Sequence, residues 1–247
     1  MRKALVLAAG LGSRIRSVAG DLPKPLMPFA GSPVLAHNLR WLAAGGVREV
    51  WINLHYGADQ VRTAIGDGAR FGLTIHYVHE PELLGTAGAL ANIAPAVSEA
   101  MLVVYGDSLV RCDLGTLART HAKAGAEVTV ALFDRDRHPH TGIAGGRVRM
   151  DGEGRITAFV EGAGEAAGLV NAGVYALQPS VLDLIPAGRL VDFGRDVFPA
   201  MLDQHRALRG WIMDDEGYCL GLDTPESHAA GLTLLAAGVV TPVVAVS

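Results

Sequence analysis

The sequence predicts an α/β fold with a Rossmann-like, mostly parallel sheet flanked by helices and a β-hairpin insertion in its second half. Apolar, β-branched segments alternate with helix-like segments up to about Phe133, which is the order expected of βαβ units around a parallel sheet. The strand-like segments are nearly all apolar, as burial on both faces requires. Beyond Phe133, two alternating segments flank DGEG and predict a hairpin.

The elements can be assigned in chain order from these patterns. In the first part we expect strands at 3–9, 48–54, 73–80, 101–107 and 127–133, separated by helices at 32–46, 58–72, 85–99 and 114–125. In the second part we expect the hairpin at 145–162, a strand at 170–177, helix-like segments at 179–186 and 193–205, strands at 207–214 and 217–223, and a terminal helix followed by a tail.

Length and composition indicate one compact domain over residues 1–247. Half of the 247 residues are hydrophobic, and no Pro/Ser-rich linker divides the chain, so it can bury one large core. A net charge of −4 gives no basic surface for a nucleic acid. The first apolar segment lacks the features of a signal peptide and predicts a buried strand.

The two cysteines are distant in sequence and favour a reducing, cytoplasmic location. The late apolar segment from Gly231 to Ser247 is interrupted by Gly238 and Pro242. It is shorter than the roughly 20 residues that a membrane-spanning helix needs. We therefore expect no membrane association, and the tail is a candidate interface between copies in a homo-oligomer.

A glycine loop, LAAGLGSR, follows the first predicted strand. The dinucleotide fingerprint fails because Ile15 replaces the third glycine, and the P-loop fails because its lysine is missing. What remains is a turn with its own arginine, Arg14, followed by Lys24 between two prolines. Backbone N–H groups and these cations predict a cradle for a polyphosphate, with Arg14 on the distal phosphates. The alternative is a tight turn with surface cations.

The joint pattern L-A-A-G-x-G-S-R and P-K-P-L-x-P resembles the signature of the sugar-1-phosphate nucleotidyltransferases, which include mannose-1-phosphate and heptose-1-phosphate guanylyltransferases. The resemblance continues in ELLGTAGAL, VVYGDSL, FVEG, VNAGVYAL, FGRDVFP and, more loosely, GLDTPES. It implies a nucleotide-binding core at about 1–133 and a sugar-phosphate-binding half at about 134–247. The implied substrates are an NTP and a sugar-1-phosphate, whose oxygen displaces pyrophosphate from the α-phosphorus.

Asp107 ends an apolar strand at the edge where open α/β sheets bind ligands. A carboxylate there calls for a cation, and Mg²⁺ prefers one or two carboxylates plus phosphates and waters. We expect Asp223 to be the second ligand. The resemblance leaves this open, because a D-I-G-T-P alignment puts Gly221 at the ligand position, whereas the M-D-T of cytidylyltransferases aligns Asp223. Asp223 could instead cap a helix, with Asp214 and Asp215 as fallback ligands.

The family motifs, carried over by position, imply the remaining nucleotide site. Arg14, Lys24 and Asp107 are the expected catalytic residues. The expected nucleotide-binding residues are Leu7, Ala8, Ala9, Gly10, Gly12, Ser13, Arg14, Glu80, Gly85 and Thr86. Thymidylyltransferases carry glutamine where this chain has Glu80. A carboxylate only accepts hydrogen bonds, and guanine offers two adjacent donors, so Glu80 favours GTP, with CTP as the alternative.

The motifs also imply a sugar-phosphate site. Its expected residues are Lys24, Gly142, Glu161, Asn171, Gly173 and Arg195. The chain departs from the family at Gly162, where most relatives have a lysine for the sugar phosphate, so Lys24 or Arg195 must supply that charge. Mannose, a manno-heptose, a cyclitol phosphate or a non-sugar phosphate all remain open. The missing lysine also keeps a non-catalytic nucleotide-sugar sensor as an alternative, whereas a dehydrogenase has little support.

Overall fold

The computed structural model describes residues 1–10, 12–142, 145–162 and 168–242. Its centre is a parallel sheet in the order β6-β1-β4-β5. The bounds are β1 Lys3–Leu7, β4 Glu49–Leu54, β5 Thr74–His79 and β6 Met101–Tyr105. These strands end at the same edge because βαβ connections return the chain to the starting edge each time. The predicted α/β class and parallel core are confirmed.

Antiparallel strands extend this sheet beyond β6. The long strand β11, Leu169–Leu177, pairs antiparallel with β6 on one side and with β8 and β9 on the other. β12 runs parallel to β8, and β9 with β10 forms the predicted hairpin. The bounds are β8 Val128–Asp134, β9 Arg147–Met150, β10 Ile156–Val160 and β12 Leu208–Ile212. Strands from both parts of the chain thus share one sheet.

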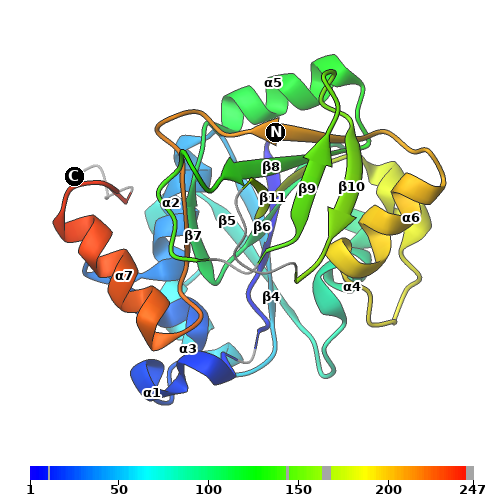
Figure 1. Cartoon of the computed structure of the whole chain (residues 1–247). Helices are drawn as coiled ribbons and strands as arrows, with labels where there is room; N and C mark the ends of the chain where they lie inside the picture. Colours follow the sequence, from blue (N-terminus) through cyan, green and yellow to red (C-terminus); the bar gives the residue numbers. More distant parts are fainter. Residues whose placement is uncertain (11, 143–144, 163–167, 243–247) are drawn as a thin grey trace.

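Helices cover both faces of the sheet (Figure 1). The first hydrophobic core joins alternate sheet residues such as Val6 to helices α2, α3 and α5, and the second joins residues such as Leu5 to α4 and α6. The bounds are α2 Val34–Ala44, α3 Ala58–Ile65, α4 Gly85–Asn92, α5 Leu114–Ala124 and α6 Phe198–Asp203. Consecutive side chains of a strand face opposite sides, so both cores draw on every central strand.

A smaller unit packs beside the sheet. β7, Ser108–Arg111, pairs with β13, Tyr218–Gly221, in a sheet of their own. This corrects the expectation that 217–223 belongs to the main sheet. Helix α7, Pro225–Ala236, follows β13 and packs with β2, Pro28–Phe29, in a third core. β2 pairs with β3, Ser32–Pro33, and α1 is a short helix over Arg16–Ala19.

Two predicted helical segments have other geometries. Residues 179–186 form a 3-10 helix, η5 (Pro179–Leu184), and 193–205 begin with a π-helix, η6 (Phe193–Val197), before α6. No helix of the described residues is long and apolar enough to cross a bilayer. Residues 243–247 of the apolar tail lie outside the described residues, so its role as an interface stays a prediction.

Candidate active site

A cavity of about 350 Å³ opens at the carboxyl ends of the parallel strands. Leu7, Asn53 and Tyr105 reach it from β1, β4 and β6, and Glu80 follows β5. Its other walls come from both parts of the chain, namely Ala9, Gly10, Leu83, Gly85, Thr86, Asp107, Leu190, Asp192 and Arg195. The cavity occupies the edge where open α/β sheets bind their ligands.

The glycine loop lies at one side of this cavity. Ala8 N–H donates to Asn53 Oδ1 at 2.8 Å, which fixes the start of the loop. Gly12 has a φ of 60°, and a Cβ there would lie 2.9 Å from Lys24 Cβ. A larger residue would therefore separate the loop from the lysine. Ser13 begins a short 3-10 helix, and Leu11 lies outside the described residues.

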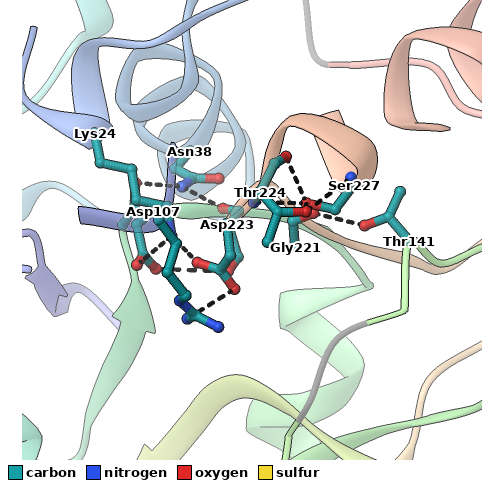
Figure 2. A network of polar contacts seen from close by, with 11 residues as sticks. Lys24, Asn38, Asp107, Thr141, Gly221, Asp223, Thr224 and Ser227 are labelled. Atoms are coloured by element: carbon teal, nitrogen blue, oxygen red, sulfur yellow. Dashed lines mark hydrogen bonds and ion pairs between the residues drawn. The ribbon is translucent and has the colours of Figure 1, made fainter. Parts of the chain in front are cut away.

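Lys24 joins the two acids that were expected to bind metal (Figure 2). Its ammonium is 2.7 Å from Asp107 Oδ2 and also pairs with Asp223 Oδ1, although these residues are far apart in sequence. Burial alone would lower the pKa of Lys24, which is 4% exposed, but the two carboxylates outweigh it and raise the pKa above its usual value. Arg14, 69% exposed, reaches Asp223 Oδ2 at 3.7 Å. Charged groups of both signs therefore converge beside the glycine loop.

Neighbouring polar groups position the two acids. Asp107 follows β6 in a turn to β7, and buried Asn38 of α2 donates to Ser108 O at 2.9 Å and to Gly106 O at 3.5 Å on either side of it. Beyond β13, Thr224 caps α7 through a reciprocal capping box with Ser227. The helix cap is therefore Thr224, and the hypothesis that Asp223 caps this helix is wrong. The Asp223 side chain is turned to the cations instead.

Gly221, Asp214 and Asp215, which were also considered for the second metal ligand, have different partners. The Gly221 carbonyl accepts the Thr141 hydroxyl at 2.7 Å (Figure 2). Asp214 accepts a backbone N–H from Asp113 at 3.2 Å, and Asp215 pairs with Arg137. Asp223 is thus the acid that the fold brings to Asp107.

The Asp107–Asp223 pair fits Mg²⁺. Each carboxylate is 30% exposed, and the Lys24 ammonium contacts both of them. Within the described ranges, no three His, Cys, Asp or Glu side chains gather in a metal-binding cluster. Two carboxylates completed by phosphate oxygens and waters are the donor set that Mg²⁺ accepts.

Glu80 is 1% exposed at the floor of the cavity and is held from two sides. Asn53 Nδ2 donates to its Oε1 at 3.0 Å, and Leu84 N–H donates to its Oε2 at 3.3 Å. The backbone carbonyl of Glu80 is in turn contacted by His55 Nδ1 at 2.7 Å. Both carboxylate oxygens are therefore held by protein donors where Glu80 lines the cavity.

Gly85 and Thr86 begin α4 at the cavity wall. The polar groups of Thr86 are hydrogen-bonded within the protein. Asp192 Oδ1 accepts both the Thr86 N–H at 3.2 Å and its hydroxyl at 3.1 Å. Val191 O accepts the N–H of the next two residues of the helix. Gly85 has a φ of 75°, and a Cβ there would meet Val191 O at 2.5 Å. This contact joins the two parts of the chain directly.

Of the five sugar-phosphate residues expected in the second part of the chain, Arg195 lines the cavity, whereas Gly142, Glu161, Asn171 and Gly173 do not belong to its lining. Arg195 lines the cavity from η6. Glu161 packs against Gly146 and Gly194, where a Cβ would lie 2.6 Å and 2.4 Å from its Oε2. Partial desolvation raises the pKa of Glu161, Arg195 opposes this, and Asp192 adds to it.

Asn171 and Gly173 lie in β11, where the register with β8 shifts. Asn171 Nδ2 donates to the Tyr175 hydroxyl at 2.7 Å, and its Oδ1 accepts Gly173 N–H at 2.9 Å, so its amide already has protein partners. Gly173 packs on Tyr105, because a Cβ there would lie 2.9 Å from the ring. Gly142 is exposed and donates its N–H to His140 Nδ1 at 3.0 Å.

Four polar residues at or beside the cavity were not predicted from the sequence, namely Asn38, Asn53, Tyr105 and Asp192, and neither were the lining residues Leu83 and Leu190. Asn38 and Asn53 are buried amides within otherwise apolar segments, and buried polar groups need partners. That signal could have identified both. Burial raises the pKa of Tyr105 to about 12, so its hydroxyl stays neutral at the cavity wall.

Comparisons with known proteins show what the whole chain is similar to. The model of the nucleotidyl transferase family matches residues 3–219. The chain is 37% identical over 239 residues to a mannose-1-phosphate guanylyltransferase of Mycobacterium tuberculosis, covering 96% of this chain and 65% of that protein. It is 32% identical over 234 residues to a UTP–glucose-1-phosphate uridylyltransferase of Synechocystis sp., covering 89% of this chain and 60% of that protein. The chain therefore spans somewhat less than two thirds of these relatives.

Solved structures share the fold. The crystal structure of HddC from Yersinia pseudotuberculosis, complexed with GMP-PN, superposes with a TM-score of 0.78 at 23% identity and covers 95% of this chain and 100% of that one. A putative glucose-1-phosphate thymidylyltransferase from Bacillus anthracis gives a TM-score of 0.81 at 20% identity, with 95% of each chain covered.

Proposed function

The chain belongs to the nucleotidyl transferase family, and from that premise we propose that it joins GTP to a sugar-1-phosphate, giving a GDP-sugar and pyrophosphate. The observation that carries the proposal is the convergence of Lys24, Asp107 and Asp223 beside the glycine loop, at the mouth of a cavity. The guanylyltransferase relative from M. tuberculosis and the GMP-PN complex of HddC support the choice of nucleotide and substrate class.

The proposed reaction is one in-line displacement. A phosphate oxygen of the sugar-1-phosphate bonds to the α-phosphorus of GTP, the bond from that phosphorus to the bridging oxygen breaks, and pyrophosphate leaves with the bonding electrons. No protein nucleophile takes part in this step. The protein contributes position and positive charge, because charge accumulates on the leaving pyrophosphate and on the equatorial oxygens.

The residues beside the glycine loop have separate roles in this proposal. Backbone N–H groups of the loop bind the triphosphate, and the exposed Arg14 stabilises the leaving pyrophosphate. Lys24 orients the attacking phosphate. Asp107 and Asp223 would hold Mg²⁺, which when bound neutralises charge on the phosphates. Asn38 keeps Asp107 in place through the backbone on both sides of it.

The preference for GTP rests on Glu80. Glu80 is buried, lines the cavity, and has both carboxylate oxygens held by protein donors. Guanine presents N1–H and its 2-amino group side by side, and a carboxylate accepts both. Uracil and thymine would turn a carbonyl oxygen toward it. We therefore propose that Glu80 binds the guanine edge.

Arg195 is the proposed partner of the sugar phosphate. It lines the same cavity as Asp107 and Gly10, and it carries the charge that Gly162 cannot supply. An arginine can bind a phosphate through two parallel hydrogen bonds. Glu161, held in place by two glycines, is proposed to bind sugar hydroxyls. Lys24 and Arg195 then neutralise the incoming phosphate from two sides.

We also propose a cytoplasmic location. Cys112 and Cys219 are both free and buried, and burial raises the pKa of each thiol. Such inert thiols suit a reducing compartment.

The proposal is tested by a matrix of GTP, CTP, UTP and dTTP against mannose, manno-heptose and glucose 1-phosphates, with pyrophosphate release as the measurement. We expect GTP with a manno-configured sugar to give the fastest release. Fastest release with CTP would overturn the role of Glu80. If the protein binds nucleotide but releases pyrophosphate with no pair of nucleotide and sugar phosphate, the proposed transferase activity is overturned and a sensor is favoured.

A further inference from the structure

Asn53 lies where the first loop meets the base-binding part of the cavity. It is near the end of β4, paired in register with Leu7 of β1 and with Val78 of β5. Its side chain is 4% exposed and lines the cavity beside Glu80. Burying a polar side chain costs free energy unless its hydrogen bonds are satisfied.

The bonds of Asn53 fix which way its amide faces. Ala8 N–H can only donate, so the atom 2.8 Å from it must be the amide oxygen. The amide nitrogen is then directed at Glu80 Oε1, 3.0 Å away. One side chain therefore joins the backbone of the glycine loop to the carboxylate of the residue that follows β5.

Glu80 needs this support because it is a buried carboxylate. Its oxygens accept from Asn53 Nδ2 and from Leu84 N–H, and no ion pair of Glu80 occurs among residues 1–10, 12–142, 145–162 and 168–242. A carboxylate has about four acceptor positions. Two are filled by the protein, so Glu80 retains acceptor positions for donors in the cavity.

We propose that Asn53 is the positioning residue that sets the nucleobase preference. By holding Glu80 Oε1 from one side, it keeps both carboxylate oxygens turned to the two adjacent donors of guanine. Because the same amide holds Ala8 N–H, it also fixes the spacing between the base site and the loop that binds the triphosphate. This inference rests on the proposed function, in which Glu80 binds guanine.

The test compares GTP with ITP, whose base keeps N1–H but lacks the 2-amino group. Dissociation constants are measured calorimetrically in the presence of Mg²⁺, so no sugar phosphate is needed. One hydrogen bond to a charged group corresponds to about a 10- to 100-fold preference for GTP in the unchanged protein. We expect Asn53→Ala to bring the ratio of the ITP and GTP dissociation constants close to one, because Glu80 loses its hydrogen bond from Asn53.

Asn53→Asp is a second variant, which keeps the size and the acceptor for Ala8. It replaces the donor that faces Glu80 with an oxygen. We therefore expect this variant also to lose the preference for GTP over ITP. Asn38→Ala is the matched control: it removes another buried amide, which supports Asp107 and does not contact Glu80. It should lower pyrophosphate release but leave the GTP to ITP ratio of affinities unchanged.

The outcomes separate the inference from the proposed function. If the unchanged protein binds GTP and ITP equally, the guanine contact of Glu80 fails. If it prefers GTP and either Asn53 variant keeps that preference, the role of Asn53 is overturned while the transferase stands. If Asn38→Ala abolishes the preference as well, the effect is general loosening of the site, and the inference is again overturned.

Discussion

At the residue scale, the site is organised by a balance of charge. Lys24 is almost fully buried, yet it is stable as a cation because Asp107 and Asp223 both contact it. The same two carboxylates come from segments that are far from the lysine in sequence, and Figure 2 shows them together beside it. The two carboxylates would repel each other without a cation beside them, so Lys24 keeps them together in this structure.

Lys24→Met should therefore destabilise the protein and make its stability depend on metal. Removing one partner of a buried ion pair costs about 3–5 kcal/mol, and the partial exposure of the acids reduces this to about 2–3 kcal/mol. For a chain of this size that is a fall in Tm of about 5–10 °C. We expect Mg²⁺ to restore part of the loss in the variant and to change the original protein much less, as measured by thermal unfolding with and without the ion.

Lys3→Met is the control for Lys24→Met. Lys3 pairs with the exposed Glu99 at 3.7 Å and donates to Ala96 O at 3.1 Å and to Ser98 Oγ at 3.2 Å, and none of these residues lines the cavity. Its loss should change the Tm by about a degree or two and give no response to Mg²⁺. If the Tm of the Lys24 variant is unchanged, or does not respond to Mg²⁺, the proposed role of Lys24 in balancing the two carboxylates is contradicted.

At the element scale, the central strands and their order of appearance follow from the sequence, because apolar runs of strand length are a local signal. The π-helix at η6 does not follow from it. There the Phe193 N–H donates to Thr86 Oγ1 at 2.9 Å and the Asp192 N–H to Asp196 Oδ2 at 2.7 Å, and the first of these contacts comes from a distant element. Lys24 and Asp223 were predicted as site residues, but their direct contact depends on the pairing of β13, which precedes Asp223, with β7.

A second ion pair joins elements of the second part to β8. Glu127 precedes β8, accepts the Ser180 hydroxyl of η5 at 2.8 Å, and binds Arg206, which precedes β12, through Nε at 3.0 Å. The hydrogen bonds from Arg206 are the main cause that lowers the pKa of Glu127 from 4.5 to about 2, against partial desolvation. The folded state therefore favours the ionised carboxylate.

The lowered pKa of Glu127 determines how its stabilisation of the fold changes with pH. Glu127 contributes its full stabilisation above about pH 4.5 and loses it as the pH falls toward about 2. Allowing for solvent screening, Glu127→Gln should lower the free energy of unfolding by about 1–2 kcal/mol at about pH 7. Urea unfolding at about pH 7, 5 and 3.5 should show this difference narrowing at the lowest pH. A constant difference would show that the charge of Glu127 is not its cause.

Glu153→Gln is the matched control for that measurement. Glu153 also pairs with an arginine, Arg155, at 2.8 Å, but both side chains are exposed. Such pairs contribute at most about 1 kcal/mol. We expect little change in the free energy of unfolding at any of the three pH values.

At the scale of the whole molecule, the cavity depends on both parts of the chain. Glu80 and Asp107 come from the first part, whereas Asp192 and Arg195 come from the second. The second part reaches the cavity because β11 extends the central sheet beside β6 and because Asp192 and Val191 bind the start of α4. A cavity with walls from both parts cannot form from either part alone.

This architecture predicts that the two parts unfold together. No sheet boundary separates them, since β6 and β11 are neighbours in one sheet and each contributes to both sheet-face cores. We therefore expect a single calorimetric transition with equal calorimetric and van't Hoff enthalpies. Asp192→Ala removes two hydrogen bonds to Thr86 and should lower the Tm by about 2–6 °C while keeping one transition. Two resolved transitions, in the original protein or in this variant, would instead mean that the parts before and after about residue 133 are separate folding units.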